Sequence, residues 1–148
     1  MYIFKTIFII IFLSISTTAN AHGVSSKNQL NCLAKNVYFE SRGESALGQI
    51  AVAWVTLNRV NSKRFPNTIC GVVFQKSQFS WANGKGKHRI PRGAAWEKSK
   101  NIAAAVYGKK HKDPTFGATY FHGKSVNPRW NRKMKLTRVI GVHKFFYH

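Results

Sequence analysis

The sequence predicts an α+β fold in which a mainly helical body is followed by a small antiparallel β-sheet at the C-terminal end. Apolar residues recur at helical spacing in three segments between residues 30 and 107. From residue 118 onward the helical period is lost, and short runs of aromatic and β-branched residues alternate with turn residues. With 4 Trp, 5 Tyr and 11 Phe among its 148 residues, the chain has enough large apolar side chains for one folded domain.

The first 21 residues have the pattern of a secretory signal peptide. Lys5 precedes an almost continuous apolar run over residues 7–15, and the small-residue sequence Ala-Asn-Ala ends at residue 21. The apolar run is short for a membrane span, although an uncleaved N-terminal anchor is the alternative. We therefore expect export to the periplasm or the medium, and one mature domain over residues 22–148 without a transmembrane span.

Two helices are expected in the first part of the mature chain. Residues 30–39 carry apolar side chains at helical spacing, and Gly43 follows as a natural stop. Residues 46–60 are apolar almost all the way round a helix, which indicates a central, buried helix. Polar residues and a proline over residues 61–67 then indicate a loop.

The middle of the chain predicts one more helix and a long loop. Residues 68–74 fit either a brief helix or an extended segment, because the periodicity does not distinguish the two. Residues 77–91 have the character of a long loop, and loops of this length in small domains are often functional. Residues 94–107 predict a helix that ends at Gly108.

The C-terminal part predicts the sheet. Residues 119–122 are a strand candidate, residues 127–130 a turn, and residues 136–146 an extended segment. Because these segments are short and separated by turn residues, we expect them to pair as an antiparallel sheet.

The chain is strongly basic, with 24 Lys and Arg against 4 Asp and Glu and a formal charge of +20. Loss of the predicted signal peptide would remove only the charge of Lys5 and leave +19. Such a chain should attract polyanions, among them nucleic acid, anionic lipid, lipopolysaccharide and anionic cell-wall polymers. No nucleic-acid-binding motif is present in the sequence, so a specific nucleic-acid partner is not expected.

The two cysteines, Cys32 and Cys70, both lie in the predicted mature domain. In an exported protein, one disulfide between them is the simplest interpretation, and two buried free thiols are the alternative. The bond would close a loop of 37 intervening residues, which stabilises the fold by about 3–4 kcal/mol in the chain-entropy model.

The four acidic residues restrict the candidates for acid–base chemistry to Glu40, Glu44, Glu97 and Asp113. Glu40 follows Tyr38 and Phe39 near the end of the first predicted helix. Burial among aromatic rings disfavours the carboxylate and raises its pKa, as the proton donor in glycosidic cleavage requires. The positive charge of the domain, with Arg42 two residues away, opposes this. The alternative is a helix-end glutamate paired with Arg42 or with a nearby lysine.

Glu44 is the second candidate. In a continuous helix its carboxyl group would share a face with that of Glu40, but Gly43 interrupts the helix. Glu44 then fits the first turn of the next helix, where the helix dipole favours an anion. If it is catalytic, it would position water or tune Glu40.

The six histidines show no metal-binding motif. His122 and His143 lie in neighbouring strand candidates and could come together, but a core or hydrogen-bonding role is the preferred interpretation. We expect neither a metal nor a cofactor. A Ser-His-Asp triad would have to use Asp113, which lies in a turn, and is discounted.

Several aromatic and amide side chains could line a groove for sugar rings, which stack on aromatic faces and hydrogen-bond to amides. They are Gln78, Phe79, Trp81, Tyr120, Phe121 and Trp130. Phe79 and Phe121 fit the core better, whereas Trp81 and Tyr120 fit either place.

The order of short motifs resembles the SleB-type cell wall hydrolases, a family that includes spore cortex-lytic enzymes and many exported Gram-negative proteins. The Y-x-E-x-R-G-E phrase at residues 38–44, followed by L-N-R-V at residues 57–60, is the most specific part. The resemblance covers about residues 30–147, through residues 32–34, 37–44, 48–53, 57–60, 65–73, 78–81 and 118–122, with Pro128, Trp130, Ile140, Gly141, His143, Phe145 and Phe146.

This resemblance implies a lysozyme-like catalytic domain that acts on the glycan of peptidoglycan. Some members look like lytic transglycosylases, and some related proteins have been labelled amidases. The glutamate taken as the catalytic acid of the family corresponds to Glu40, with Glu44 as the matching second carboxylate. The matching motifs also supply the substrate-binding candidates, which are Gln78, Ser80, Trp81, Tyr120 and His122.

The expected function is cleavage of the glycan strand between N-acetylmuramic acid and N-acetylglucosamine by an exported lytic transglycosylase. That chemistry needs one carboxyl group, which suits a chain so poor in acids, whereas hydrolysis normally needs two. A muramidase-type hydrolase or an N-acetylmuramoyl-L-alanine amidase is the near alternative, and a non-enzymatic basic envelope or nucleic-acid-binding protein the distant one. The expected partners are peptidoglycan glycan strands and, by charge, anionic envelope polymers, with the enzyme acting as a monomer.

Overall fold

A computed structural model describes residues 26–82 and 92–148 of the chain. The predicted signal peptide, and most of the loop expected over residues 77–91, lie outside the described residues. The described part contains α-helices, two short 3-10 helices and three strands. They are α1 (Ser26–Ser41), α2 (Ala46–Val60), α3 (Ile69–Val73), η1 (Ser80–Ala82), α4 (Ala94–Tyr107), β1 (Tyr120–Gly123), η2 (Arg129–Lys133), β2 (Lys135–Ile140) and β3 (His143–Tyr147).

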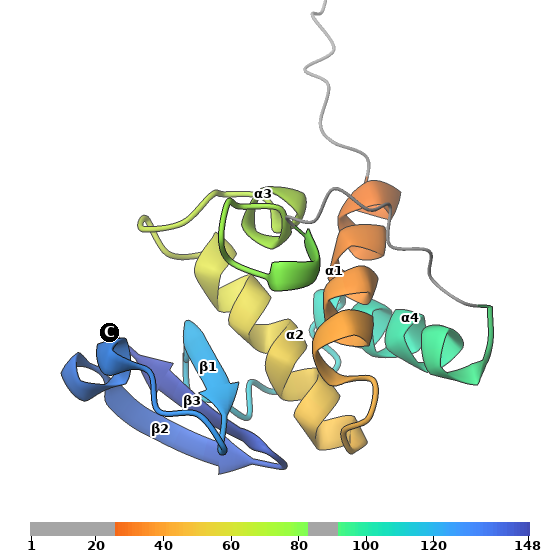
Figure 1. The fold of residues 1–148 in the computed structure, drawn as a ribbon. Coiled ribbons are helices and arrows are strands. Elements are labelled where there is room, and N and C mark those ends of the chain that lie inside the picture. The colour runs from red at the N-terminus through yellow and green to blue at the C-terminus, as the bar shows by residue number, and fades with distance from the viewer. Residues whose placement is uncertain (1–25, 83–91) are drawn as a thin grey trace, which may run out of the picture.

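Helix α2 is the centre of the fold, with α1 and α4 on one side of it and the sheet on the other (Figure 1). It begins after Ser45, whose side chain accepts a hydrogen bond from the backbone N–H of Gly48 at 3.3 Å and so caps the helix. One side of α2 joins the larger core, which is formed with apolar residues of α1, α3 and α4. Ala51 and Val55, on another side, join a second core with Phe145 of the sheet.

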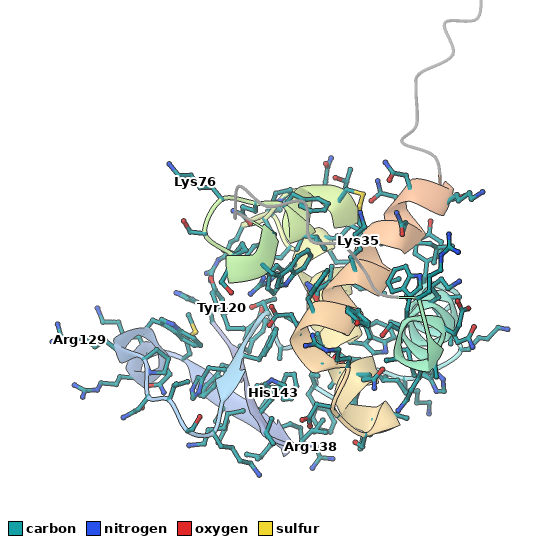
Figure 2. All side chains as sticks on the ribbon, turned by 45° about the vertical axis from the view of Figure 1, so that its right-hand side comes forward. Lys35, Lys76, Tyr120, Arg129, Arg138 and His143 are labelled. Carbon is teal, nitrogen blue, oxygen red and sulfur yellow. A yellow bond between two sulfur atoms is a disulfide. The ribbon has the colours of Figure 1, made fainter. Side chains whose placement is uncertain are left out.

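The sheet has the strand order β1-β3-β2, and both pairings are antiparallel. Its central strand β3 buries Phe145 and Phe146 completely or nearly so. The chain reverses between β2 and β3 at Gly141, whose φ of +56° lies in the left-handed region that favours glycine. In Figure 2, His143 lies where the sheet meets the helices, whereas Arg129 projects outward at the periphery.

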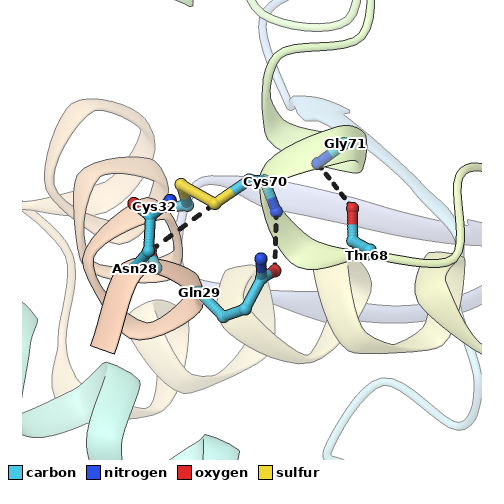
Figure 3. Close-up of a disulfide and its surroundings, with 6 residues drawn as sticks. All are labelled: Asn28, Gln29, Cys32, Thr68, Cys70 and Gly71. Carbon is cyan, nitrogen blue, oxygen red and sulfur yellow. Dashed lines mark hydrogen bonds between the residues drawn. A yellow bond between two sulfur atoms is a disulfide. The ribbon is translucent and has the colours of Figure 1, made fainter. Parts of the chain in front are cut away.

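The expected disulfide between Cys32 and Cys70 is present and joins α1 to α3 (Figure 3). The Cα atoms of the two cysteines are 5.3 Å apart, a normal separation for a disulfide. Beside the bond, the side-chain oxygen of Gln29 accepts a hydrogen bond from the backbone N–H of Cys70 at 3.0 Å. Thr68 caps α3 by accepting a hydrogen bond from the backbone N–H of Gly71 at 3.1 Å.

The architecture expected from the sequence is confirmed: a mainly helical body precedes a small C-terminal antiparallel sheet. The bounds of α2 and α4 agree with those expected, while α1 begins at Ser26 rather than at residue 30. The brief-helix alternative holds for α3. The extended segment expected over residues 136–146 is two strands, because Gly141 permits a tight reversal that the apolar pattern alone does not reveal. No helix in the described ranges is long and apolar enough to cross a bilayer.

Candidate active site

Glu40 is the penultimate residue of α1, and an aromatic side chain from a distant part of the sequence fixes its carboxyl group. The indole Nε1–H of Trp81, in η1, donates a hydrogen bond to Oε1 of Glu40 at 2.8 Å. Phe39 holds the indole in place by stacking on it, with ring centroids 4.6 Å apart. Burial raises the pKa of Glu40, and the hydrogen bond from Trp81 and the positive charge of Arg59 oppose that rise without cancelling it.

Two hollows meet at Glu40. One has a volume of about 260 Å³ and is bounded by Glu40, Arg59, Gln78, Phe79, Ser80, Phe121, His122, Gly123 and His143. The other, of about 340 Å³, is bounded by Phe39, Glu40, Ser41, Arg42, Gly43, Glu44, Val142 and His143. Glu40 and His143 are the two residues that both linings share. Glu40 therefore lies where an extended chain of sugar rings could pass from one hollow to the other.

Arg59 of α2 is a buried cation in the wall of the smaller hollow. Its side chain is only 5% exposed, and its Nε–H donates a hydrogen bond to the carbonyl oxygen of Thr119 at 2.6 Å. The guanidinium lies over the rings of Phe65, Phe79 and Tyr120, at 5.2, 5.7 and 5.6 Å from their centroids. Burial lowers the pKa of Arg59 to about 10, so the group stays charged at neutral pH.

His122 and His143 lie on neighbouring strands, but their side chains leave opposite faces of the sheet, because His122 pairs with Lys144. His122 stacks on Phe146, and its Nδ1 donates a hydrogen bond to the carbonyl oxygen of Gly123 at 2.8 Å. His143 lines both hollows, and its Nδ1 is buried without a hydrogen-bond partner among the residues that the structure describes. Burial lowers the pKa of His143, with Glu44 opposing the change, and this favours the neutral imidazole.

The other three acidic side chains have different environments. Oε2 of Glu44 accepts a hydrogen bond from the backbone N–H of Val142 at 3.2 Å, which links the start of α2 to the β2–β3 turn. Glu97 forms an exposed ion pair with Lys100. Asp113 accepts hydrogen bonds from four donors, two of them backbone N–H groups, and so fixes the loop before β1. Within the described ranges, no three His, Cys, Asp or Glu side chains form a group that could hold a metal ion.

The structure brings most of the expected substrate-binding residues to Glu40. Gln78, Ser80 and His122 line the smaller hollow, and Trp81 touches the carboxyl group itself. Tyr120 does not line either hollow and instead packs between Arg59 and the ring of Trp130. Phe79 and Phe121, expected in the core, are buried and half-buried, yet each also borders the smaller hollow.

Arg59 was not assigned a role from the sequence. It stands in a helix that is otherwise apolar nearly all round, and a lone cation in such a helix was the available signal. His143 was expected to have a core or hydrogen-bonding role, and its place beside Glu40 was not predicted, because that place depends on the reversal at Gly141. A third hollow, of about 760 Å³, lies away from Glu40 between α1 and α4, and its walls contain no buried titratable group.

The family model for cell wall hydrolases matches residues 43–146 of the chain. The chain belongs to the cell wall hydrolase family. Glu44 lies inside the matched range and Glu40 three residues before it. Glu40 is the candidate acid of this cell wall hydrolase because of its burial, its hydrogen bond from Trp81 and its place between two hollows.

Curated relatives and solved structures agree with that family. The chain is 46% identical over 131 residues to the spore cortex-lytic enzyme of Bacillus subtilis (strain 168), which covers 88% of this chain and 41% of the relative. It is 38% identical over 121 residues to the spore cortex-lytic enzyme of Bacillus cereus, covering 81% of this chain and 44% of the relative. The chain thus spans less than half the length of these enzymes.

The solved structures correspond to the catalytic part alone. The catalytic domain of the Bacillus cereus SleB protein superposes with a TM-score of 0.70 at 33% identity, over 89% of this chain and 99% of that one. The catalytic domain of the germination-specific lytic transglycosylase SleB from Bacillus anthracis also gives 0.70, at 34% identity, over 84% and 98%. The described fold of this cell wall hydrolase is therefore that of the SleB catalytic domain.

Proposed function

We propose that this cell wall hydrolase is an exported enzyme that cuts the peptidoglycan glycan between N-acetylmuramic acid and N-acetylglucosamine by lytic transglycosylation. The observation that carries the proposal is the position of Glu40. Its carboxyl group is buried enough to have a raised pKa, is held by Trp81, and lies where two hollows meet. A carboxylic acid that retains its proton near neutral pH can donate it to a leaving glycosidic oxygen.

In this reaction Glu40 acts twice. It first gives its proton to the glycosidic oxygen as the bond from the muramic acid anomeric carbon to that oxygen breaks. The resulting carboxylate then takes the proton of the 6-hydroxyl of the same muramic acid, whose oxygen closes on the anomeric carbon to form the anhydro ring. The proton returns to Glu40, so the reaction consumes no water and requires no second carboxylate.

The proposed substrate contacts follow from the walls of the hollows. Gln78 and Ser80 offer amide and hydroxyl groups to sugar hydroxyl and N-acetyl groups, and His122 lines the same hollow. Trp81 keeps the role of orienting the acid, and Tyr120 would act only through Arg59, since it lines neither hollow. The exposed lysine and arginine side chains would add a salt-dependent attraction to anionic envelope polymers.

Glu44 has a proposed role in either chemistry. Its contact with Val142 supports the β2–β3 turn that carries His143 into the site. If water rather than the 6-hydroxyl attacked, Glu44 would be the carboxylate available to position it, because both carboxyl groups border the larger hollow. The Bacillus anthracis neighbour, a lytic transglycosylase by name, supports the one-carboxyl reaction.

Export is supported by the disulfide, because such bonds persist mainly in oxidising compartments. The signal peptide expected over residues 1–21 would deliver the chain there.

The proposal is tested by digestion of purified sacculi, with the products identified by mass spectrometry. The variant E40Q should lose at least about 100-fold in rate, the usual contribution of a general acid. The matched control is E97Q, the same change in an exposed glutamate that forms only the pair with Lys100, and it should retain the wild-type rate. Wild-type activity in E40Q would remove Glu40 from the mechanism.

The products distinguish the alternatives. Anhydro-muramyl ends support transglycosylation, whereas reducing ends would mean hydrolysis by a muramidase-type reaction. Release of free stem peptides would mean an amidase. No product from sacculi, together with tight and salt-sensitive binding of DNA, would favour the non-enzymatic alternative.

A further inference from the structure

Arg59 is a buried charge without a carboxylate against it. Among the described residues the ion pair found joins Glu97 to Lys100, so no acidic side chain is in direct contact with the guanidinium. Nη1 of Arg59 is buried and has no hydrogen-bond partner in that part of the chain. Besides the bond to Thr119, the guanidinium contacts the rings of Phe65, Phe79 and Tyr120.

Such an arrangement costs stability. The effective penalty for burying an ion is several kcal/mol even after relaxation. Three ring contacts of about 0.5–2 kcal/mol each and one charge-assisted hydrogen bond offset part of it. A leucine or methionine at this position would fill the same space without the penalty, so the burial alone does not explain an arginine.

The charge faces the proposed acid. Arg59 and Glu40 border the same small hollow, and each contributes electrostatically to the other. The rings of Phe65, Phe79 and Tyr120 hold the guanidinium in place and keep water from screening it. Because α2 is the central helix, the position of this cation relative to the end of α1 is fixed by the packing of the core.

We infer that Arg59 is the electrostatic positioning residue for Glu40: it stabilises the carboxylate that Glu40 becomes when the leaving oxygen takes its proton. The inference rests on the proposed function for its catalytic meaning. Burial favours the protonated carboxyl group before the reaction, and the charge of Arg59 favours the carboxylate that remains after the proton is transferred. In the second step the same charge is present while the carboxylate takes the proton of the 6-hydroxyl. Burial favours the acid and Arg59 favours the carboxylate, so Glu40 can pass from either form to the other.

Other groups face Glu40 from the elements around it. Trp81 of η1 donates its hydrogen bond, and His143 of β3 borders both hollows with a lowered pKa. Arg42 and Glu44 border the larger hollow. Arg42 lies over the ring of Tyr38 at 5.1 Å and is exposed to solvent, which screens its charge. His122 of β1 completes the set in the smaller hollow.

The test measures the titration of Glu40 directly, without any enzyme assay. The sequence has three glutamates, so a protein labelled with ¹³C at the glutamate side-chain carboxyl gives three resonances, assigned with E40Q and E97Q. We expect R59Q to move the Glu40 midpoint to higher pH than in the wild type. R59K replaces the forked guanidinium by an ammonium group but keeps the positive charge, so its Glu40 midpoint should lie closer to that of the wild type. R42Q, the change in the sequence neighbour, should move it less than R59Q.

Equal midpoints in R59Q and the wild type, both folded by their amide spectra, would overturn the inference. So would a larger shift in R42Q than in R59Q. If R59Q does not fold, the wild type titrated between about 0.05 M and about 1 M NaCl decides: a buried partner resists screening, so the Glu40 midpoint should move little. A large upward movement with salt would assign the effect to surface charges. These outcomes do not depend on sacculi, so they remain distinct from a failure of the proposed function.

Discussion

The contact between Glu44 and the β2–β3 turn makes a quantitative prediction for Gly141→Ala. A Cβ at position 141 would lie 1.9 Å from Oε2 of Glu44, and the backbone there has φ of +56°. The left-handed backbone alone costs an L-residue about 1–2 kcal/mol. The carboxylate must also leave the N–H of Val142, which adds about 1 kcal/mol because this hydrogen bond is charge-assisted but solvent-exposed. The expected loss in unfolding free energy is about 2–3 kcal/mol.

Gly117→Ala is the matched control for the backbone term. Gly117 also has a positive φ, of +81°, but a Cβ there would meet no atom within 4 Å. We expect it to cost only the backbone term of about 1–2 kcal/mol. Urea unfolding of the oxidised protein, followed by tryptophan fluorescence, measures both variants. In an E44A background the extra cost at Gly141 should vanish, because no carboxylate remains to be displaced. Equal costs for the two glycines, or an unchanged difference without Glu44, would refute the reasoning.

Four further outcomes are expected. E40Q should unfold at higher urea than the wild type at neutral pH, because the raised pKa of Glu40 means that its contribution to stability is complete below its ordinary pKa of 4.5 and is lost as pH rises through the folded pKa. The same difference in urea midpoint between E40Q and the wild type at pH 4 and at pH 8 would contradict this. W81F keeps the aromatic stack but removes the hydrogen bond, so the alkaline limit of activity on sacculi should move to higher pH. Replacing Cys32 and Cys70 by serine should cost about 3–4 kcal/mol in urea unfolding, against no change on reduction of that variant. D113A should lose about 2–4 kcal/mol, since four donors lose their acceptor, and a loss below 1 kcal/mol would show that the loop adapts.

The sequence predicted the local environment of Glu40 better than its distant partners. Tyr38 and Phe39 correctly indicated an aromatic setting, and a raised pKa follows from burial in that setting. The opposing charge was expected from the basic domain and from Arg42, two residues away, but Arg42 lies beyond the end of α1, and positions two apart on a helix do not face each other. The opposing charge comes instead from Arg59, and the hydrogen bond from Trp81, because folding brings α2 and η1 to the end of α1.

Elements with a strong period were predictable, and those that depend on one backbone angle were not. Helix α2 is recognisable because its apolar side chains serve cores on two sides. The turn at Gly141 was missed because the apolar residues on both sides of it read as one extended run. Tyr120 fits a sugar groove by residue type, but whether its ring meets the hollow or the guanidinium of Arg59 depends on how β1 packs against α2.

Helix α2 packs into two hydrophobic cores, and this has a consequence for how the protein unfolds. Ala51 and Val55 belong to the core beneath the sheet, while Ile50 and Ala53, one and two positions away, belong to the core among the helices. If α2 unwinds, both cores lose their shared wall at once, so the helical and sheet portions of the described chain melt in a single all-or-none step.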